Sequence, residues 1–167
     1  MAHAKYTQIY WDSSCFLCFL NKLEEERRKI CEDVLTHAQS GDIVLYTSTY
    51  TIAEVIRPKA KSLPGATKLT PEEIEKISGM FQWPWLRKID VDQRVAMHAV
   101  TLSRDYNLYP ADAVHAASAI LRKAQVLQRW DRDFDKVNHL IKVEEPQMIT
   151  LDMPLFPEMK KTIGPEP

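Results

Sequence analysis

The stretch YWDSSCFL, residues 10–17, places a carboxylate and two hydroxyls between two apolar segments. Residues 6–11 have the composition of a buried strand, and residues 15–20 have that of an apolar helix. A charge buried at such a junction is costly unless it is paired, protonated or bound to a metal. Asp12 is therefore either the cap of the helix or part of a functional site.

The same alternation of strand and helix continues along the chain. Helical patterns carry their own boundary signals: Gly41 is a stop, Thr70 opens a capping box, and Asp92 is a cap. An alanine-rich helix is expected at residues 112–123. Strands alternating with helices predict an α/β fold, a mostly parallel sheet with helices on both faces. Further strands are expected at residues 43–47, 86–91, 126–130 and 148–151.

Length and composition indicate one globular domain. The chain has 167 residues, which is enough for a sizeable core. We expect a domain over residues 1–153, with an inserted loop and helix at 57–85 and a proline-containing tail at 154–167. A formal net charge of −1 argues against binding nucleic acid by bulk charge alone, and it allows a local basic rim around an acidic site.

The cysteines and the absence of long apolar runs bear on the compartment. Three cysteines, with Cys15 and Cys18 in a CxxC, are too few for a disulfide framework and suit small core side chains. No stretch has the length of a membrane span, and the first residues lack the apolar core of a signal peptide. We expect a soluble cytoplasmic protein with no membrane partner.

Four acids fall where the expected parallel strands end, or at the start of the helices nearby. Asp12 and Asp131 follow strands, Glu54 lies in the helix after the second strand, and Asp112 opens the alanine-rich helix. Each alone has a structural explanation as a cap, a turn residue or a solvated side chain. Together, at one edge of a sheet, they would raise one another's pKa values unless a cation lay among them. Oxygen ligands of this kind suit Mg²⁺ or Mn²⁺, which support phosphodiester cleavage.

Four segments, in their order and approximate spacing, resemble a PIN domain and most of all the VapC-type toxin ribonucleases. They are YWDSSCFL, STYTIAEVI, LYPADAVHAASAI and WDRDF, and the resemblance covers residues 6–151. It implies a three-layer α/β/α fold and a metal-dependent nuclease, in most members a single-strand endoribonuclease. Matching the family motifs residue by residue implies a catalytic, metal-binding quartet of Asp12, Glu54, Asp112 and Asp131, an accessory metal ligand at Asp133, and a supporting hydroxyl at Ser14.

The chain departs from the family pattern in three places. Arg129 replaces the hydroxyl residue usually found two positions before the last acid, and Trp130 is bulky for a neighbour of a metal site. The insertion at 57–85 and the tail after residue 151 make the chain longer than the compact toxins.

Three further features each have two interpretations. His115 lies one helical turn from Asp112 and can serve packing or hydrogen bonding, or touch substrate. The segment FQWPWL, residues 81–86, can be core or dimer contact, or a base-stacking platform. The basic residues can be solvated or can contact substrate phosphates; as substrate-binding candidates they are Arg57, Lys59, Lys61 and Arg132.

The hypothesis is an Mg²⁺- or Mn²⁺-dependent endoribonuclease acting on RNA, a homodimer, and the toxin partner of an antitoxin protein. The alternative is a catalytically weak PIN-like module that binds RNA or protein. A phosphohydrolase of another α/β type is disfavoured because the first strand ends in DSS rather than paired aspartates. The chain also has only four glycines and lacks a glycine-rich phosphate loop.

Overall fold

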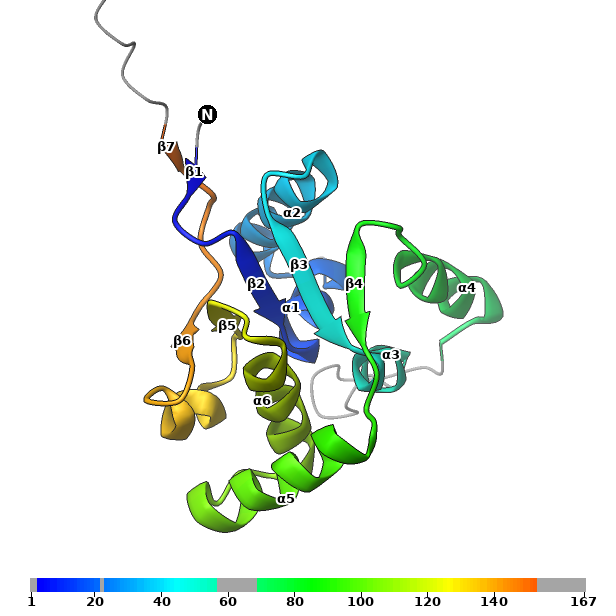
Figure 1. The fold of residues 1–167 in the computed structure, drawn as a ribbon. Coiled ribbons are helices and arrows are strands. Elements are labelled where there is room, and N and C mark those ends of the chain that lie inside the picture. Colours follow the sequence, from blue (N-terminus) through cyan, green and yellow to red (C-terminus); the bar gives the residue numbers. More distant parts are fainter. Residues whose placement is uncertain (1–2, 22, 57–68, 153–167) are drawn as a thin grey trace, which may run out of the picture.

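A computed structural model describes residues 3–21, 23–56 and 69–152. Its centre is a five-stranded sheet in the order β4-β3-β2-β5-β6, and every pairing in it is parallel. The expected mostly parallel α/β sheet is therefore confirmed (Figure 1). The strands are β2 (Gln8–Trp11), β3 (Val44–Ser48), β4 (Leu86–Ile89), β5 (Val126–Gln128) and β6 (Lys142–Glu144).

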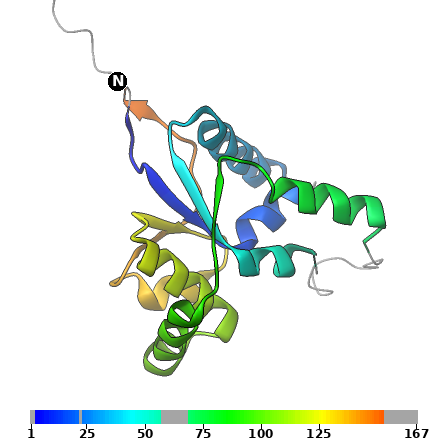
Figure 2. The ribbon, with the colours of Figure 1, turned by 45° about the vertical axis from the view of Figure 1, so that its right-hand side comes forward.

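Helices cover both faces of this sheet and give three layers (Figure 2). Side chains alternate along β2, so that Ile9 and Trp11 enter one core and Tyr10 enters the other. The first core is completed by α1 (Ser13–Leu20), α2 (Glu25–Ser40), α3 (Thr49–Ile56) and α4 (Pro71–Met80). The second is completed by α5 (Gln93–Tyr106), α6 (Pro110–Arg122) and the 3₁₀ helix η1 (Arg132–Val137).

The helix boundaries follow the local signals. Gly41 ends α2 in the left-handed region at φ 84°, where a residue without a side chain fits best. Thr70 and Glu73 form the capping box of α4, with Pro71 at its first turn. The Asp92 carboxylate accepts a hydrogen bond from the Val95 N–H at 2.9 Å and caps α5. These three predictions are confirmed.

Two strand predictions were wrong. Strand β6 was not expected, because only Val143 is buried in its three residues and such a short run has no readable period. The strand expected at 148–151 contributes only Leu151 to β7 (Leu151–Asp152). That strand pairs antiparallel with β1 (His3–Ala4) in a separate ribbon, beyond the end where β2 begins (Figure 1).

The segment at residues 81–86 belongs to the first core. Phe81 and Leu86 are buried, and the half-buried rings of Trp83 and Trp85 stack at a centroid distance of 4.8 Å against that core. The segment leads into β4 and therefore lies at the amino ends of the strands, whereas the acids follow their carboxyl ends. Core packing is thus the interpretation that the structure supports. Among the described helices, none combines the length and the apolar character needed to cross a membrane.

Candidate active site

The segments that carry the predicted acids meet at the carboxyl edge of the sheet, where α1, α3 and α6 begin (Figure 1). Asp12 directly follows β2, and Asp131 lies three residues after β5. Glu54 lies in α3, the helix that begins where β3 ends, and Asp112 lies in the first turn of α6. Because the strands are parallel, these four positions share one end of the molecule.

Asp12 is both a helix cap and a member of this group. It is 4% exposed, and its Oδ1 accepts hydrogen bonds from the Cys15 N–H at 3.3 Å and from the Ser14 hydroxyl at 2.6 Å. Burial raises the pKa of Asp12, while His115, Ser14 and the Cys15 N–H act to lower it. The two interpretations of the opening motif are therefore compatible.

Ser14 does more than contact its neighbour in sequence. While its hydroxyl donates to Asp12, its oxygen accepts a hydrogen bond from the Trp130 N–H at 2.9 Å. The Asp12 N–H also donates to the Gln128 carbonyl at 3.3 Å. These contacts fix the residue after β2 against the residues after β5, so the first and last acids of the group are held in one frame.

The charges of the group act on the pKa of Asp112. Burial is the main cause that raises its pKa to about 6, and the carboxylates of Asp133, Asp131 and Asp12 raise it further, against an opposing effect of His115. These acids come from three different segments of the chain. Their effect on one another shows that the fold concentrates negative charge at this edge.

Asp131 and Asp133 are carried by η1. The Asp131 carboxylate accepts a hydrogen bond from the Asp133 N–H at 3.3 Å, which caps η1. Arg129, just before this turn, is buried and forms ion pairs with Asp135 and with Glu145, the latter at 3.7 Å. The arginine that replaces the usual hydroxyl thus ties η1 to the segment after β6.

A buried hydrogen-bond chain joins Glu54 to the second core. The Nε2 of His115 lies 2.7 Å from Glu54 Oε2, and its Nδ1 lies 2.9 Å from the Tyr10 hydroxyl. His115 is 1% exposed. The sequence predicted either a packing or hydrogen-bonding role for His115 or contact with substrate, and the structure supports hydrogen bonding. Its partners, Tyr10 and Glu54, were not predicted. A tyrosine inside a buried strand does signal that its hydroxyl needs a partner.

The donor chemistry of the group fits a hard divalent cation. Its ligands are carboxylate oxygens, and their mutual repulsion is relieved when a cation binds. Within the described ranges, no three acidic, histidine or cysteine side chains already stand close enough to hold an ion together. The residues that would hold the ion are Asp12, Glu54, Asp112, Asp131 and Asp133.

The basic residues are only partly placed. Arg132 is exposed between Asp131 and Asp133, at the rim of the acidic group. Arg57, Lys59 and Lys61 lie outside the described residues, so their predicted contact with substrate stays a prediction.

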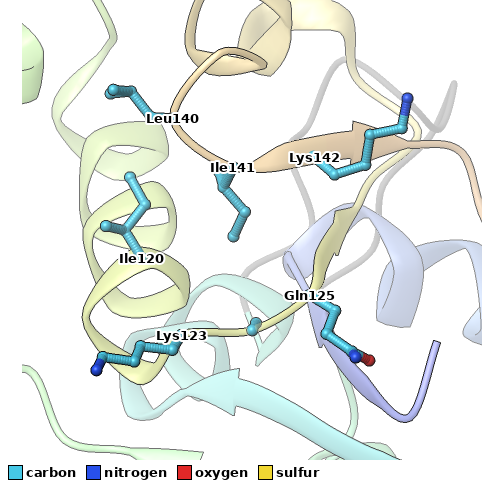
Figure 3. Close-up of a pocket in the computed structure, with 7 residues that line it drawn as sticks. Ile120, Lys123, Gln125, Leu140, Ile141 and Lys142 are labelled. Carbon is cyan, nitrogen blue, oxygen red and sulfur yellow. The ribbon is translucent and has the colours of Figure 1, made fainter.

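A pocket of about 350 Å³ lies elsewhere, between the end of α6 and the starts of β5 and β6 (Figure 3). Lys123, Gln125 and Lys142 give it a polar rim, and Ile120 and Ile141 give it apolar walls. Since strands begin here and the acids follow strand ends, this pocket is not the acidic site.

Comparisons with known proteins agree with this architecture. Residues 9–140 match the PIN domain family. A toxin–antitoxin complex from Klebsiella pneumoniae is 18% identical, with a TM-score of 0.58 over 84% of this chain and 99% of that one. VapC20 of Mycobacterium tuberculosis, a sarcin-ricin loop cleaving toxin, is 15% identical, with a TM-score of 0.59 over 76% and 92%. Comparison with curated proteins finds no match.

A third similar structure contains nucleic acid. It is VapBC2 from Rickettsia felis bound to a DNA fragment from its promoter, which is 15% identical with a TM-score of 0.59 over 83% of this chain and 98% of that one. At these identities the three likenesses concern the fold.

Proposed function

The chain belongs to the PIN domain family, and from this premise we propose that it is a metal-dependent endoribonuclease that hydrolyses phosphodiester bonds of single-stranded RNA in the cytoplasm. The observation that carries the proposal is the placement of Asp12, Asp112, Asp131 and Asp133 at one edge of the sheet, where burial first and then the other three charges raise the pKa of Asp112 to about 6. Carboxylates held together against their own repulsion are stabilised by a bound cation, which supports a metal-dependent reaction. Likeness to a toxin that cleaves the sarcin-ricin loop supports RNA as the substrate.

The residues of the chain have separate tasks in this function. Asp12, Glu54, Asp112 and Asp131 would hold Mg²⁺ or Mn²⁺, with Asp133 beside them. When bound, the ion supplies an activated water and neutralises charge on the phosphate. Ser14 orients Asp12 through the 2.6 Å hydrogen bond, and His115 orients Glu54. Arg132, exposed at the rim, meets the RNA backbone, and Arg57, Lys59 and Lys61 are proposed to extend that contact.

The deciding experiment incubates the purified protein with an unstructured RNA and with a perfect duplex of the same sequence, each with Mn²⁺, Mg²⁺ or EDTA. We expect cleavage of the single strand with either ion and none with EDTA. RNA binding without cleavage under every condition would favour the alternative, a catalytically weak binding module. Equal cleavage of the duplex would contradict the single-strand specificity.

The proposed biological role is that of a toxin held by an antitoxin protein. Two of the similar structures are toxin–antitoxin or VapBC assemblies, which supports a protein partner. We propose that this partner covers the acidic edge. A homodimer is also proposed. The segment at 81–86, which could have been a dimer contact, packs into the first core. The support that remains is on α5, where Met97 and Val100 are 60% and 58% exposed. Light scattering at tens of micromolar protein tests the dimer, and a monomer there contradicts it.

Metal binding should depend on pH through Asp112. A proton on this carboxyl competes with the cation, and its pKa of about 6 lies far above the ordinary 3.8. Lowering the pH from 7.5 to 5 is therefore expected to weaken Mn²⁺ binding about ten-fold, since the fall begins near pH 6 and is about ten-fold per unit below it. Calorimetric titration of Mn²⁺ at both pH values measures this. A constant affinity down to pH 5 would show that Asp112 is not a ligand.

Removing the Ser14 hydroxyl should weaken the site without unfolding it. Ser14→Ala deletes the bond to Asp12 and the acceptor of the Trp130 N–H. Residues that orient metal ligands typically contribute 10- to 100-fold in metal affinity, so we expect a loss of about ten-fold for Mn²⁺. Ser14→Thr keeps the hydroxyl and should stay within about two-fold of the unmodified protein. An unchanged affinity in Ser14→Ala would leave the hydroxyl with a structural role only.

A further inference from the structure

We propose that Tyr109 and Tyr50 hold the bases of the RNA by stacking beside the acidic group, one just before α6 and the other on α3. The inference rests on the proposed function and adds how a single strand is gripped. It gives base stacking to two tyrosines at the carboxyl edge instead of the tryptophans of residues 81–86, which pack at the amino edge against the first core.

The ring of Tyr109 is exposed on a fixed backbone. Tyr109 is 70% exposed and lies three positions before Asp112. Its carbonyl accepts a hydrogen bond from the Ala113 N–H at 2.8 Å, and the preceding Leu108 is 4% exposed in the second core. The chain on both sides of the ring is therefore anchored, while the ring itself faces water.

The turn before Tyr109 is tied to the segment that carries two of the acids. Asn107 adopts the left-handed region at φ 53°, and its carbonyl accepts a hydrogen bond from Lys136 Nζ at 2.9 Å. Lys136 belongs to η1, which also holds Asp131 and Asp133. Tyr109 thus keeps its place relative to both Asp112 and η1.

Tyr50 lies in the first turn of α3. Its ring centroid is 6.1 Å from that of His115, which bonds to Glu54. Tyr50 and Glu54 are four residues apart and so share one face of the helix. Tyr50 is 38% exposed, so its ring packs partly against the protein and is partly open to solvent.

Stacking solves a problem that the acids create. A cluster of carboxylates repels the phosphates of RNA, so that backbone contacts alone give weak, salt-sensitive binding. An aromatic ring binds the π-face of any base, and the contact is worth about five-fold or more in affinity per base. Bases are free to stack on protein rings in a single strand and not in a duplex. Two rings beside one acidic group therefore favour the single strand.

The test compares ring and non-ring side chains of similar size. We expect Tyr109→Leu to raise the KM for an unstructured RNA at least about five-fold with kcat within two-fold, and Tyr109→Phe to match the unmodified protein. Tyr50→Leu and Tyr50→Phe should behave in the same way. Met148→Ala, at an exposed residue between β6 and β7, is the control and should change neither constant. Melting temperatures confirm that each variant is folded.

A binding measurement separates this inference from the proposed function. Fluorescence anisotropy follows a labelled RNA and a matched RNA with abasic sites, both in EDTA, where the proposed cleavage does not occur. The unmodified protein should bind the abasic RNA more weakly than the RNA that has its bases. Tyr109→Leu should bind the abasic RNA as tightly as the unmodified protein does. The stacking role would be overturned if Tyr109→Leu lost the same affinity for both RNAs. It would also be overturned if Tyr109→Leu kept its affinity for RNA and bound a protein inhibitor more weakly. Failure of the unmodified protein to cleave would refute the nuclease while leaving the stacking measurement valid.

Discussion

Replacing Asp112 with asparagine is expected to lower the rate of RNA cleavage by at least about 100-fold, and Asp12→Asn should do the same. Each change keeps the shape of the side chain and removes a charge that the cation needs. A fall of this size is typical when a ligand of a catalytic metal is lost, because the ion both activates water and neutralises the phosphate. The rate is measured on a short unstructured RNA at saturating Mn²⁺.

The same change should stabilise the metal-free protein. The pKa of Asp112 is raised to about 6 in the folded state, above its ordinary 3.8, so the folded state binds the proton more tightly. The resulting stability is complete below about pH 3.8 and is lost as the pH rises through 6. At pH 7 the ionised carboxylate therefore destabilises the fold, and Asp112→Asn should raise the melting temperature by about 2–4 °C.

Asp42→Asn is the matched control for both measurements. Asp42 lies at the start of β3, at the opposite edge, and pairs with His37 on the surface, where such pairs contribute little. Its cleavage rate and melting temperature should be unchanged. Cleavage by Asp12→Asn or Asp112→Asn at the unmodified rate would contradict the placement of the active site at this edge.

The second large effect is expected at His115. His115→Leu removes the hydrogen bonds to the Tyr10 hydroxyl and to Glu54 in a buried setting. A buried hydroxyl such as that of Tyr10 costs about 1–3 kcal/mol when it loses a hydrogen bond, and the lost contact to the half-buried Glu54 adds to this cost, so we expect the free energy of unfolding to fall by about 3 kcal/mol. The melting temperature should fall by roughly 6–12 °C. Cleavage should also fall, because Glu54 loses the group that orients it.

Two variants separate the parts of this network. Tyr10→Phe removes only the bond between Oη and Nδ1 and should cost about half as much stability while keeping most of the cleavage. His139→Leu changes an exposed histidine and should alter neither property. If His115→Leu has the same melting temperature as the unmodified protein, the chain of hydrogen bonds does not stabilise the fold.

The parts of the site that depend on neighbours in sequence could be predicted, and the parts that depend on long-range contact could not. Asp12 could be identified because a carboxylate between a strand and a helix is expected either to cap the helix or to belong to a site. The partnership of His115 with Glu54 joins residues 61 positions apart and leaves no periodic trace in the sequence. The same holds for Ser14 and Trp130, 116 positions apart.

The fold shows the same division. Caps and stops such as Thr70 and Gly41 act within one helical turn, and they were predicted correctly. Strand β6 was missed because its place in the sheet is set by pairing with β5, which the residues of β6 do not encode by themselves. Arg129 was recognised as a departure from the family, but its ion pairs with Asp135 and Glu145 depend on how η1 and the segment after β6 meet.

The pairing of β1 with β7 brings the first and last strands of the described fold together. His3 is in register with Asp152, so the two ends of the described fold lie side by side. They lie beyond the amino ends of the strands, away from the acids (Figure 1). A domain with adjacent ends suits insertion into a loop of a host protein and circular permutation. Either rearrangement, or a surface tether at these strands, would leave the acidic edge open to a long RNA.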